Sequence, residues 1–112
     1  SFYQKGESVV GLLAEKGIDA TLINPRYLND VDAATLDALK PDHQLVVTLE
    51  DGCKDGGFGE RIAAFFGTSN MKVLVGGIKK DLYDRFDHQQ LLSDNRLLDD
   101  QIADDILKIV RP

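Results

Sequence analysis

The sequence predicts a three-layer α/β fold, in which helices cover both faces of an open, mainly parallel β-sheet. Two observations support this prediction. Short apolar segments rich in β-branched residues alternate along the chain with segments of helical periodicity, as they do in βαβ units. In addition, residues 44–49 are almost continuously apolar, which is typical of a strand that is covered on both faces in a parallel sheet.

The amino-terminal part of the chain is expected to form a helix followed by a strand. Residues 7–16 carry four apolar side chains at helical spacing, namely Val9, Val10, Leu12 and Leu13. Gly17 follows them, and glycine is common where helices end. Residues 20–24 are short and β-rich, and Pro25 ends this strand because proline cannot donate a hydrogen bond to a neighbouring strand.

A second helix, the clearest strand and a third helix come next. Asp32 is a suitable N-cap for a helix that runs to Leu39, with Leu36 and Leu39 facing the core. The strand over residues 44–49 follows. The third helix, over residues 57–66, has one strongly apolar face that is made of Phe58, Ile62, Phe65 and Phe66.

The rest of the chain is expected to contribute one more strand and the last helix. Residues 71–75 form the third strand, which the glycines at 76–77 bound. Asp99 is expected to cap a helix over residues 99–110, whose apolar stripe is Ile102, Ile106, Ile109 and Val110. We expect all three strands to be parallel and adjacent. Two further residues, one in the central strand and one on the third helix, are expected in the core: Val46 and Phe65.

Composition describes one domain without a nucleic-acid or membrane partner. The 112 residues are enough for a single core. The net charge of -6 argues against binding to nucleic acid or to an anionic membrane, because both require a basic face. Cys53 is the single cysteine, so no internal disulfide forms, and the chain does not open with a signal-peptide pattern. A cytoplasmic location is therefore expected.

A glycine-rich segment, residues 55–60, has two interpretations. It follows a strand and opens a helix, the position at which backbone N–H groups bind phosphate. The glycines do not have the spacing of a dinucleotide-binding motif or of a P-loop. The acidic residues in and just before the segment would also repel an anion, namely Glu50, Asp51 and Asp55. We therefore favour a structural interpretation, in which Gly56, Gly57 and Gly59 allow the helix to pack close to a neighbouring strand.

Three polar residues near strand ends are candidates for structural or interface roles. Glu50 follows the 44–49 strand, but it and the adjacent Asp51 point to opposite faces, so the pair is unsuited to shared acid–base chemistry. His43 precedes this strand and is expected to bond to local backbone. Arg26 follows the 20–24 strand and is expected to pair with Glu50 or Asp51, or else to contact a partner surface. No catalytic, cofactor-binding or metal-ligating group of residues is predicted.

Four motifs follow one another along the chain: residues 17–27, 31–32, 43–51 and 56–59. The first contains a strand and the turn Arg26-Tyr27, the third runs from His43 through the central strand to Glu50, and the fourth is Gly-Gly-Phe-Gly. In this order they resemble the C-terminal domain of thiamine-diphosphate enzymes of the transketolase group, most of all the 1-deoxy-D-xylulose-5-phosphate synthases. The resemblance begins near Glu7 and continues through residues 84–86, 89–92 and 99–110.

The resemblance implies that this chain is a scaffold and dimer-supporting domain of a larger enzyme. In this family thiamine diphosphate and Mg²⁺ bind to the two preceding domains, which also supply the activating glutamate. Glu50 matches a different family glutamate, so no cofactor is implied for this chain, and the domain alone would be inactive. The parent would combine pyruvate, after decarboxylation, with glyceraldehyde 3-phosphate, in isoprenoid and thiamine precursor synthesis. The family domain also begins with one more strand, which lies outside this chain.

Two alternatives remain open at this point. The same domain occurs in transketolases and in the β subunit of 2-oxo-acid dehydrogenases, where it would dock other subunits. Alternatively, the chain is a free-standing module that binds a small ligand or a protein at its glycine-rich segment. An upstream Gly-Asp-Gly…Asn cofactor motif in the same reading frame would favour the enzyme.

Overall fold

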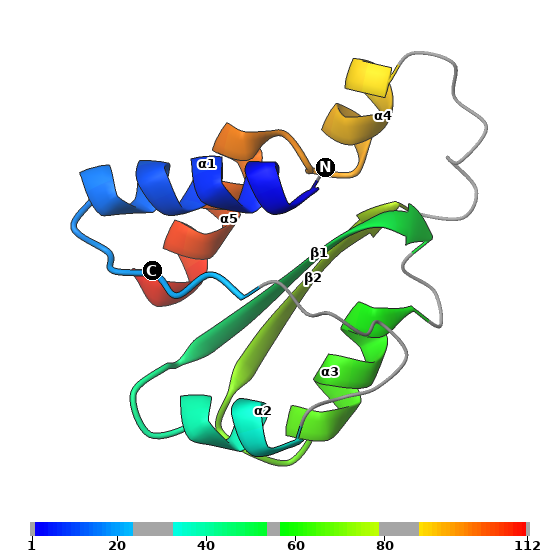
Figure 1. Ribbon diagram of the computed structural model, residues 1–112. Coiled ribbons are helices and arrows are strands. Elements are labelled where there is room, and N and C mark those ends of the chain that lie inside the picture. The colour runs from blue at the N-terminus through cyan, green and yellow to red at the C-terminus, as the bar shows by residue number, and fades with distance from the viewer. Residues whose placement is uncertain (1, 24–32, 54–56, 79–87, 112) are drawn as a thin grey trace.

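The computed structural model describes residues 2–23, 33–53, 57–78 and 88–111 (Figure 1). In these residues the elements follow one another as α1 (Phe2–Glu15), α2 (Ala33–Leu39), β1 (Leu45–Cys53), α3 (Phe58–Phe66), β2 (Lys72–Ile78), α4 (His88–Asp94) and α5 (Asp99–Val110). Helices α1, α4 and α5 lie on one face of the sheet, and α2 and α3 lie on the other. The prediction of a three-layer α/β fold is therefore confirmed.

The described part of the sheet consists of β1 and β2, which are parallel. Their register runs from Leu45 opposite Lys72 to Leu49 opposite Gly76, and it becomes irregular between Leu49 and Cys53. Helix α3 forms the crossover between the two strands, which makes β1-α3-β2 a βαβ unit. The predicted parallel pairing of the second and third strands is confirmed.

The prediction of a strand over residues 20–24 is wrong for its described part. Residues 20–23 have no regular secondary structure, and Asn24 lies outside the described residues. A strand exists only through hydrogen bonds to a neighbouring strand, which local sequence cannot supply. This segment instead packs through its own side chains, since the Leu22 side chain lies against Gly6 of α1 and Ala20 packs against the buried residues of α1, α4 and α5.

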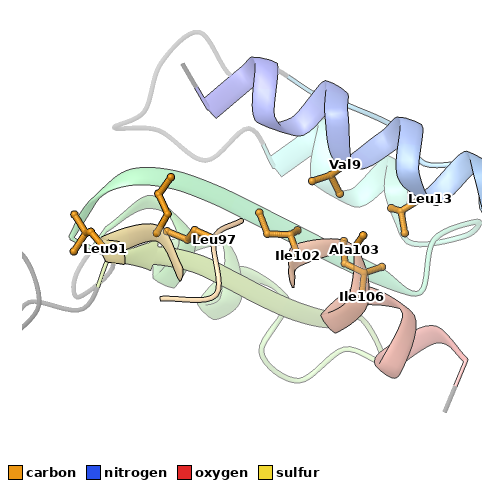
Figure 2. Close-up of a cluster of buried hydrophobic side chains, with 8 residues drawn as sticks. Val9, Leu13, Leu91, Leu97, Ile102, Ala103 and Ile106 are labelled. Carbon is orange, nitrogen blue, oxygen red and sulfur yellow. The ribbon is translucent and has the colours of Figure 1, made fainter. Parts of the chain in front are cut away.

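The larger of the two hydrophobic cores lies between the sheet and helices α1, α4 and α5 (Figure 2). Its eight buried residues are Val9, Leu13, Leu91, Leu92, Leu97, Ile102, Ala103 and Ile106. Alternate residues of β1 pack against this core from the sheet side, namely Leu45, Val47 and Leu49. The predicted apolar stripe of the last helix supplies Ile102 and Ile106 to it, while Ile109 and Val110 are half-buried.

The second core lies between the sheet and helices α2 and α3. Its buried residues are Leu36, Ile62 and Phe66, and partly buried Leu39, Val46, Phe58, Phe65, Met71 and Val73 pack against them. Because Val46 faces this core while its neighbours Leu45 and Val47 face the other, both faces of β1 are covered, as predicted.

Phe65 packs against this core as predicted, but the fully buried ring is that of its neighbour Phe66. Phe66 is 1% exposed, whereas Phe65 is half-buried and stands edge-on to the Phe66 ring at a centroid distance of 5.0 Å. Phe66 lies four residues after Ile62, so these two side chains share the helix face that points to the sheet. The Lys40 ammonium lies 5.4 Å from the centre of the Phe65 ring and 5.9 Å from that of the Phe66 ring.

Helices α1 and α4 both end in a left-handed residue. Gly17 has a φ of 80° and Ile18 donates its N–H to the Leu13 carbonyl, so the predicted helix end at Gly17 is confirmed. After α4, the residue that corresponds to Gly17 is Arg96, and its φ of 59° is unfavourable for a residue that has a Cβ. The turn at Arg96 directs Leu97, which is 1% exposed, into the larger core.

The prediction that β2 ends at Val75 is wrong, because the strand continues through Gly76 and Gly77 to Ile78. A Cβ on Gly76 would lie 2.9 Å from a methyl carbon of Leu49 and 3.2 Å from one of Leu97. The glycine is therefore needed inside the strand, where the α4–α5 turn crosses the sheet closely.

Asp99 is the first residue of α5 rather than its N-cap, which corrects the predicted cap. The N-cap is Leu98, whose backbone N–H donates to the side-chain oxygen of Gln101 at 3.1 Å. The Asp99 carboxylate is instead paired with Lys5 of α1 at 2.7 Å. At the other end of the two helices, Arg111 donates to the Lys16 carbonyl at 2.7 Å, so α1 and α5 run parallel and are joined at both ends.

Replacing Phe66 by alanine is expected to lower the free energy of unfolding by about 3–5 kcal/mol, because loss of a fully buried ring leaves a cavity. Phe65→Ala is the matched control, and its partly exposed ring is expected to cost roughly half as much. Urea unfolding of both variants measures the difference. An equal or larger loss for Phe65→Ala would contradict the assignment of Phe66 as the anchor of this core.

The Lys5–Asp99 pair is expected to couple the two helices by about 1 kcal/mol in a double-mutant cycle that uses Lys5→Gln and Asp99→Asn. The pair is partly shielded, because the Lys5 side chain is 14% exposed. The exposed Lys108–Asp104 pair within α5 is the control, with an expected coupling of about 0.3–0.5 kcal/mol. A coupling for Lys5–Asp99 no larger than the control would show that the pair does not join the helices.

Candidate functional site

The predicted site residues lie at opposite ends of β1 rather than in one place. His43 comes just before the strand, whereas Glu50 lies toward its carboxyl end, next to Gly57 and Gly59 at the start of α3. Seven residues of extended strand span about 23 Å, so His43 cannot act together with Glu50. Arg26 and Gly56 lie outside the described residues.

At the carboxyl end of the strand, Glu50 binds the first turn of α3. Its Oε1 accepts a hydrogen bond from the backbone N–H of Gly59 at 3.2 Å. The N-cap of this helix is Gly57, which has no side chain to accept such a bond. Glu50 therefore supplies the missing acceptor from the strand, and its negative charge is favourable beside a helix N-terminus.

Gly59 allows α3 to approach both strands closely. A Cβ at this position would lie 2.5 Å from Oγ1 of Thr48 and 2.6 Å from a methyl carbon of Val75. Neither distance is possible for a real side chain, so the first turn of α3 touches the sheet only because residue 59 is glycine. These distances support the packing interpretation of the glycine-rich segment. They give phosphate binding no support, because the Gly59 N–H is already bound to a carboxylate.

Thr48 is a residue of this region that the sequence interpretation missed. It is 8% exposed, and its Oγ1 has no hydrogen-bond partner within the described ranges. The signal that could have revealed it is a single hydroxyl inside the apolar run at 44–49. In the structure Thr48 forms the surface against which Gly59 packs.

At the amino end of the strand, His43 connects three segments. Its Nδ1 lies 3.2 Å from the Leu39 carbonyl at the end of α2 and 2.7 Å from Oδ1 of Asp42. Its Nε2 lies 3.1 Å from the Thr21 hydroxyl. With a proton on Nδ1, the ring donates to Leu39 or Asp42 and accepts from Thr21. The expected contact between His43 and local backbone is thus present.

The contacts of His43 do not make a nucleophilic site. In such sites a buried carboxylate orients the imidazole, but the Asp42 side chain is 75% exposed. The Thr21 hydroxyl, which lies next to the imidazole as a nucleophile would, belongs to an exposed residue. The arrangement therefore serves to join α2, β1 and the segment after α1.

Three acidic residues of α5, namely Asp99, Asp104 and Asp105, form ion pairs. Arg96 donates to both carboxylate oxygens of Asp105, at 2.7 and 3.3 Å, and Lys108 pairs with Asp104 at 3.0 Å. The hydrogen bonds that Arg96 donates to Asp105, followed by the negative charges of nearby aspartates, raise the pKa of Arg96 above its ordinary value. Next to this pair, a hollow of about 250 Å³ opens between the sheet and the α4–α5 turn, over Val47, Leu49 and Leu74.

Across the described ranges, no three His, Cys, Asp or Glu side chains come together in a way that could hold a metal ion. Within the same residues, no helix has the length and apolar character that crossing a bilayer requires. The side chain of Cys53 is not among those described.

Comparison with known sequences gives a consistent result. The family model described as "Transketolase, C-terminal domain" matches residues 4–93. The chain is 36% identical over 102 residues to a 1-deoxy-D-xylulose-5-phosphate synthase of Gloeothece citriformis, and 33% identical over 104 residues to one of Leifsonia xyli. These matches cover 89% and 91% of this chain but 16% of each relative. The chain thus spans about a sixth of the length of the curated relatives it matches.

A solved structure has a similar fold. The chain described as "Split gene transketolase, inactive beta4 tetramer" matches 95% of this chain with a TM-score of 0.77. The match covers 34% of that chain at 22% sequence identity, so the similarity concerns the fold alone.

Replacing Gly59 by alanine is expected to lower the free energy of unfolding by about 1–3 kcal/mol, because the added methyl group must displace Thr48 or Val75. Gly11→Ala in α1 is the matched control. A Cβ at Gly11 has no neighbour within 4 Å, so alanine there is expected to stabilise the helix by about 0.5–1 kcal/mol. Equal effects of the two substitutions in denaturant unfolding would rule out the close approach at Gly59.

Replacing Glu50 by alanine is expected to cost about 1–2 kcal/mol, because the Gly59 N–H loses its acceptor. Glu50→Gln keeps a side-chain oxygen and removes the charge, so its expected cost is only about 0.3–1 kcal/mol. Amide hydrogen exchange at Gly59 provides a local readout, with faster exchange in Glu50→Ala than in Glu50→Gln. If Gly59 exchanged at the same rate in both variants, Glu50 would not be the acceptor.

Proposed function

Because the chain belongs to the transketolase C-terminal domain family, we propose that its 112 residues form one non-catalytic domain of a larger thiamine-diphosphate-dependent transferase. The family match, together with relatives that are about six times as long, carries this proposal. A free-standing binding module is less well supported, since the N–H of Gly59 in the glycine-rich segment is engaged by Glu50 within the domain.

The parent enzyme, on this proposal, is a 1-deoxy-D-xylulose-5-phosphate synthase. It would combine pyruvate and glyceraldehyde 3-phosphate to give 1-deoxy-D-xylulose 5-phosphate and CO₂, a precursor of isoprenoids and thiamine. The observation that favours this activity over that of a transketolase or a 2-oxo-acid dehydrogenase is sequence identity. Two relatives that carry the synthase name are 36% and 33% identical over most of the chain.

The family's cofactor is thiamine diphosphate with Mg²⁺, and two observations in the described residues bear on where it binds. Within the described ranges, no three His, Cys, Asp or Glu side chains come together in a way that could hold a metal ion. A diphosphate at the N-terminus of α3 would meet the Glu50 carboxylate on the Gly59 N–H. We therefore assign cofactor binding and the chemical step to the rest of the parent enzyme.

The role that we assign to this chain is to hold its own strand ends in place and to orient the domain against the rest of the enzyme. The contacts of Glu50 with Gly59, and of His43 with Leu39 and Thr21, support the first part. For the two parts together we propose six structural or interface residues: Arg26, His43, Glu50, Gly56, Gly57 and Gly59.

On this proposal, the partners of the chain are the remaining domains of the parent enzyme and a second copy of that enzyme in a homodimer. We place the enzyme in the cytoplasm, which is consistent with the acidic net charge and the single cysteine.

The full-length parent tests the proposed activity. Purified enzyme is expected to release CO₂ from pyruvate and form 1-deoxy-D-xylulose 5-phosphate only when glyceraldehyde 3-phosphate, thiamine diphosphate and Mg²⁺ are all present. Ribose 5-phosphate with xylulose 5-phosphate serves as the alternative substrate pair. Turnover of that pair, without reaction of pyruvate, would identify a transketolase and overturn the synthase assignment.

The same preparation tests the assignment of the cofactor site. Calorimetric titration with thiamine diphosphate and Mg²⁺ is expected to show saturable binding to the full-length parent and none to residues 1–112 alone. The isolated chain must first show cooperative unfolding, so that absence of binding is not caused by absence of folding. Saturable binding of the cofactor to the folded fragment would contradict a purely structural role.

A further inference from the structure

We draw no further inference here: the strongest candidate, the hollow between the β1–β2 face and the α4–α5 turn, carries nothing because the Arg96 guanidinium at its rim is already bound by Asp105 and nothing in the structure shows what would cover its apolar floor.

Discussion

The parallel pairing of β1 with β2 is the constraint on which the rest of the structure depends. Parallel strands cannot be joined by a tight turn, so the chain between them must cross the sheet, and it does so as α3. Since both strands are apolar on both faces, each face also needs a helical layer of its own. Helices α1, α4 and α5 form one layer, while α2 and α3 form the other.

The contact between the crossover helix and the strands accounts for the candidate residues toward the carboxyl end of β1. Gly59 removes side-chain volume where α3 meets Thr48 and Val75, and Glu50 supplies the acceptor for the first turn of the helix. Open α/β sheets usually bind ligands at this edge, beyond the carboxyl ends of their strands. Here Glu50 at that edge is engaged by the domain itself, through the backbone N–H of Gly59.

Sequence periodicity was sufficient for the elements whose formation depends on their own residues. The apolar spacing of residues 7–16, 57–66 and 99–110 predicted three helices. The structure contains all three, although the first begins at Phe2, well before the predicted start. The continuous apolar run at 44–49 predicted a strand covered on both faces, and β1 is such a strand. Gly17 predicted the end of α1, because a left-handed helix end is a local demand on the backbone.

The tertiary structure alone decided the features that depend on a distant partner. Residues 20–23 have strand-like composition but form no ladder, and Gly76 stays within β2 because Leu97 crosses it from a turn 21 residues away. Asp99 is paired with Lys5, which is 94 residues away in the sequence, so its capping signal could not predict its contact. The sequence by itself thus determined where helices form, where a strand is buried and where α1 ends, because those preferences act over one or two turns of chain. Whether residues 20–23 join the sheet, which ring fills the core and which carboxylate pairs with which cation were decided by packing between segments that are distant in the sequence.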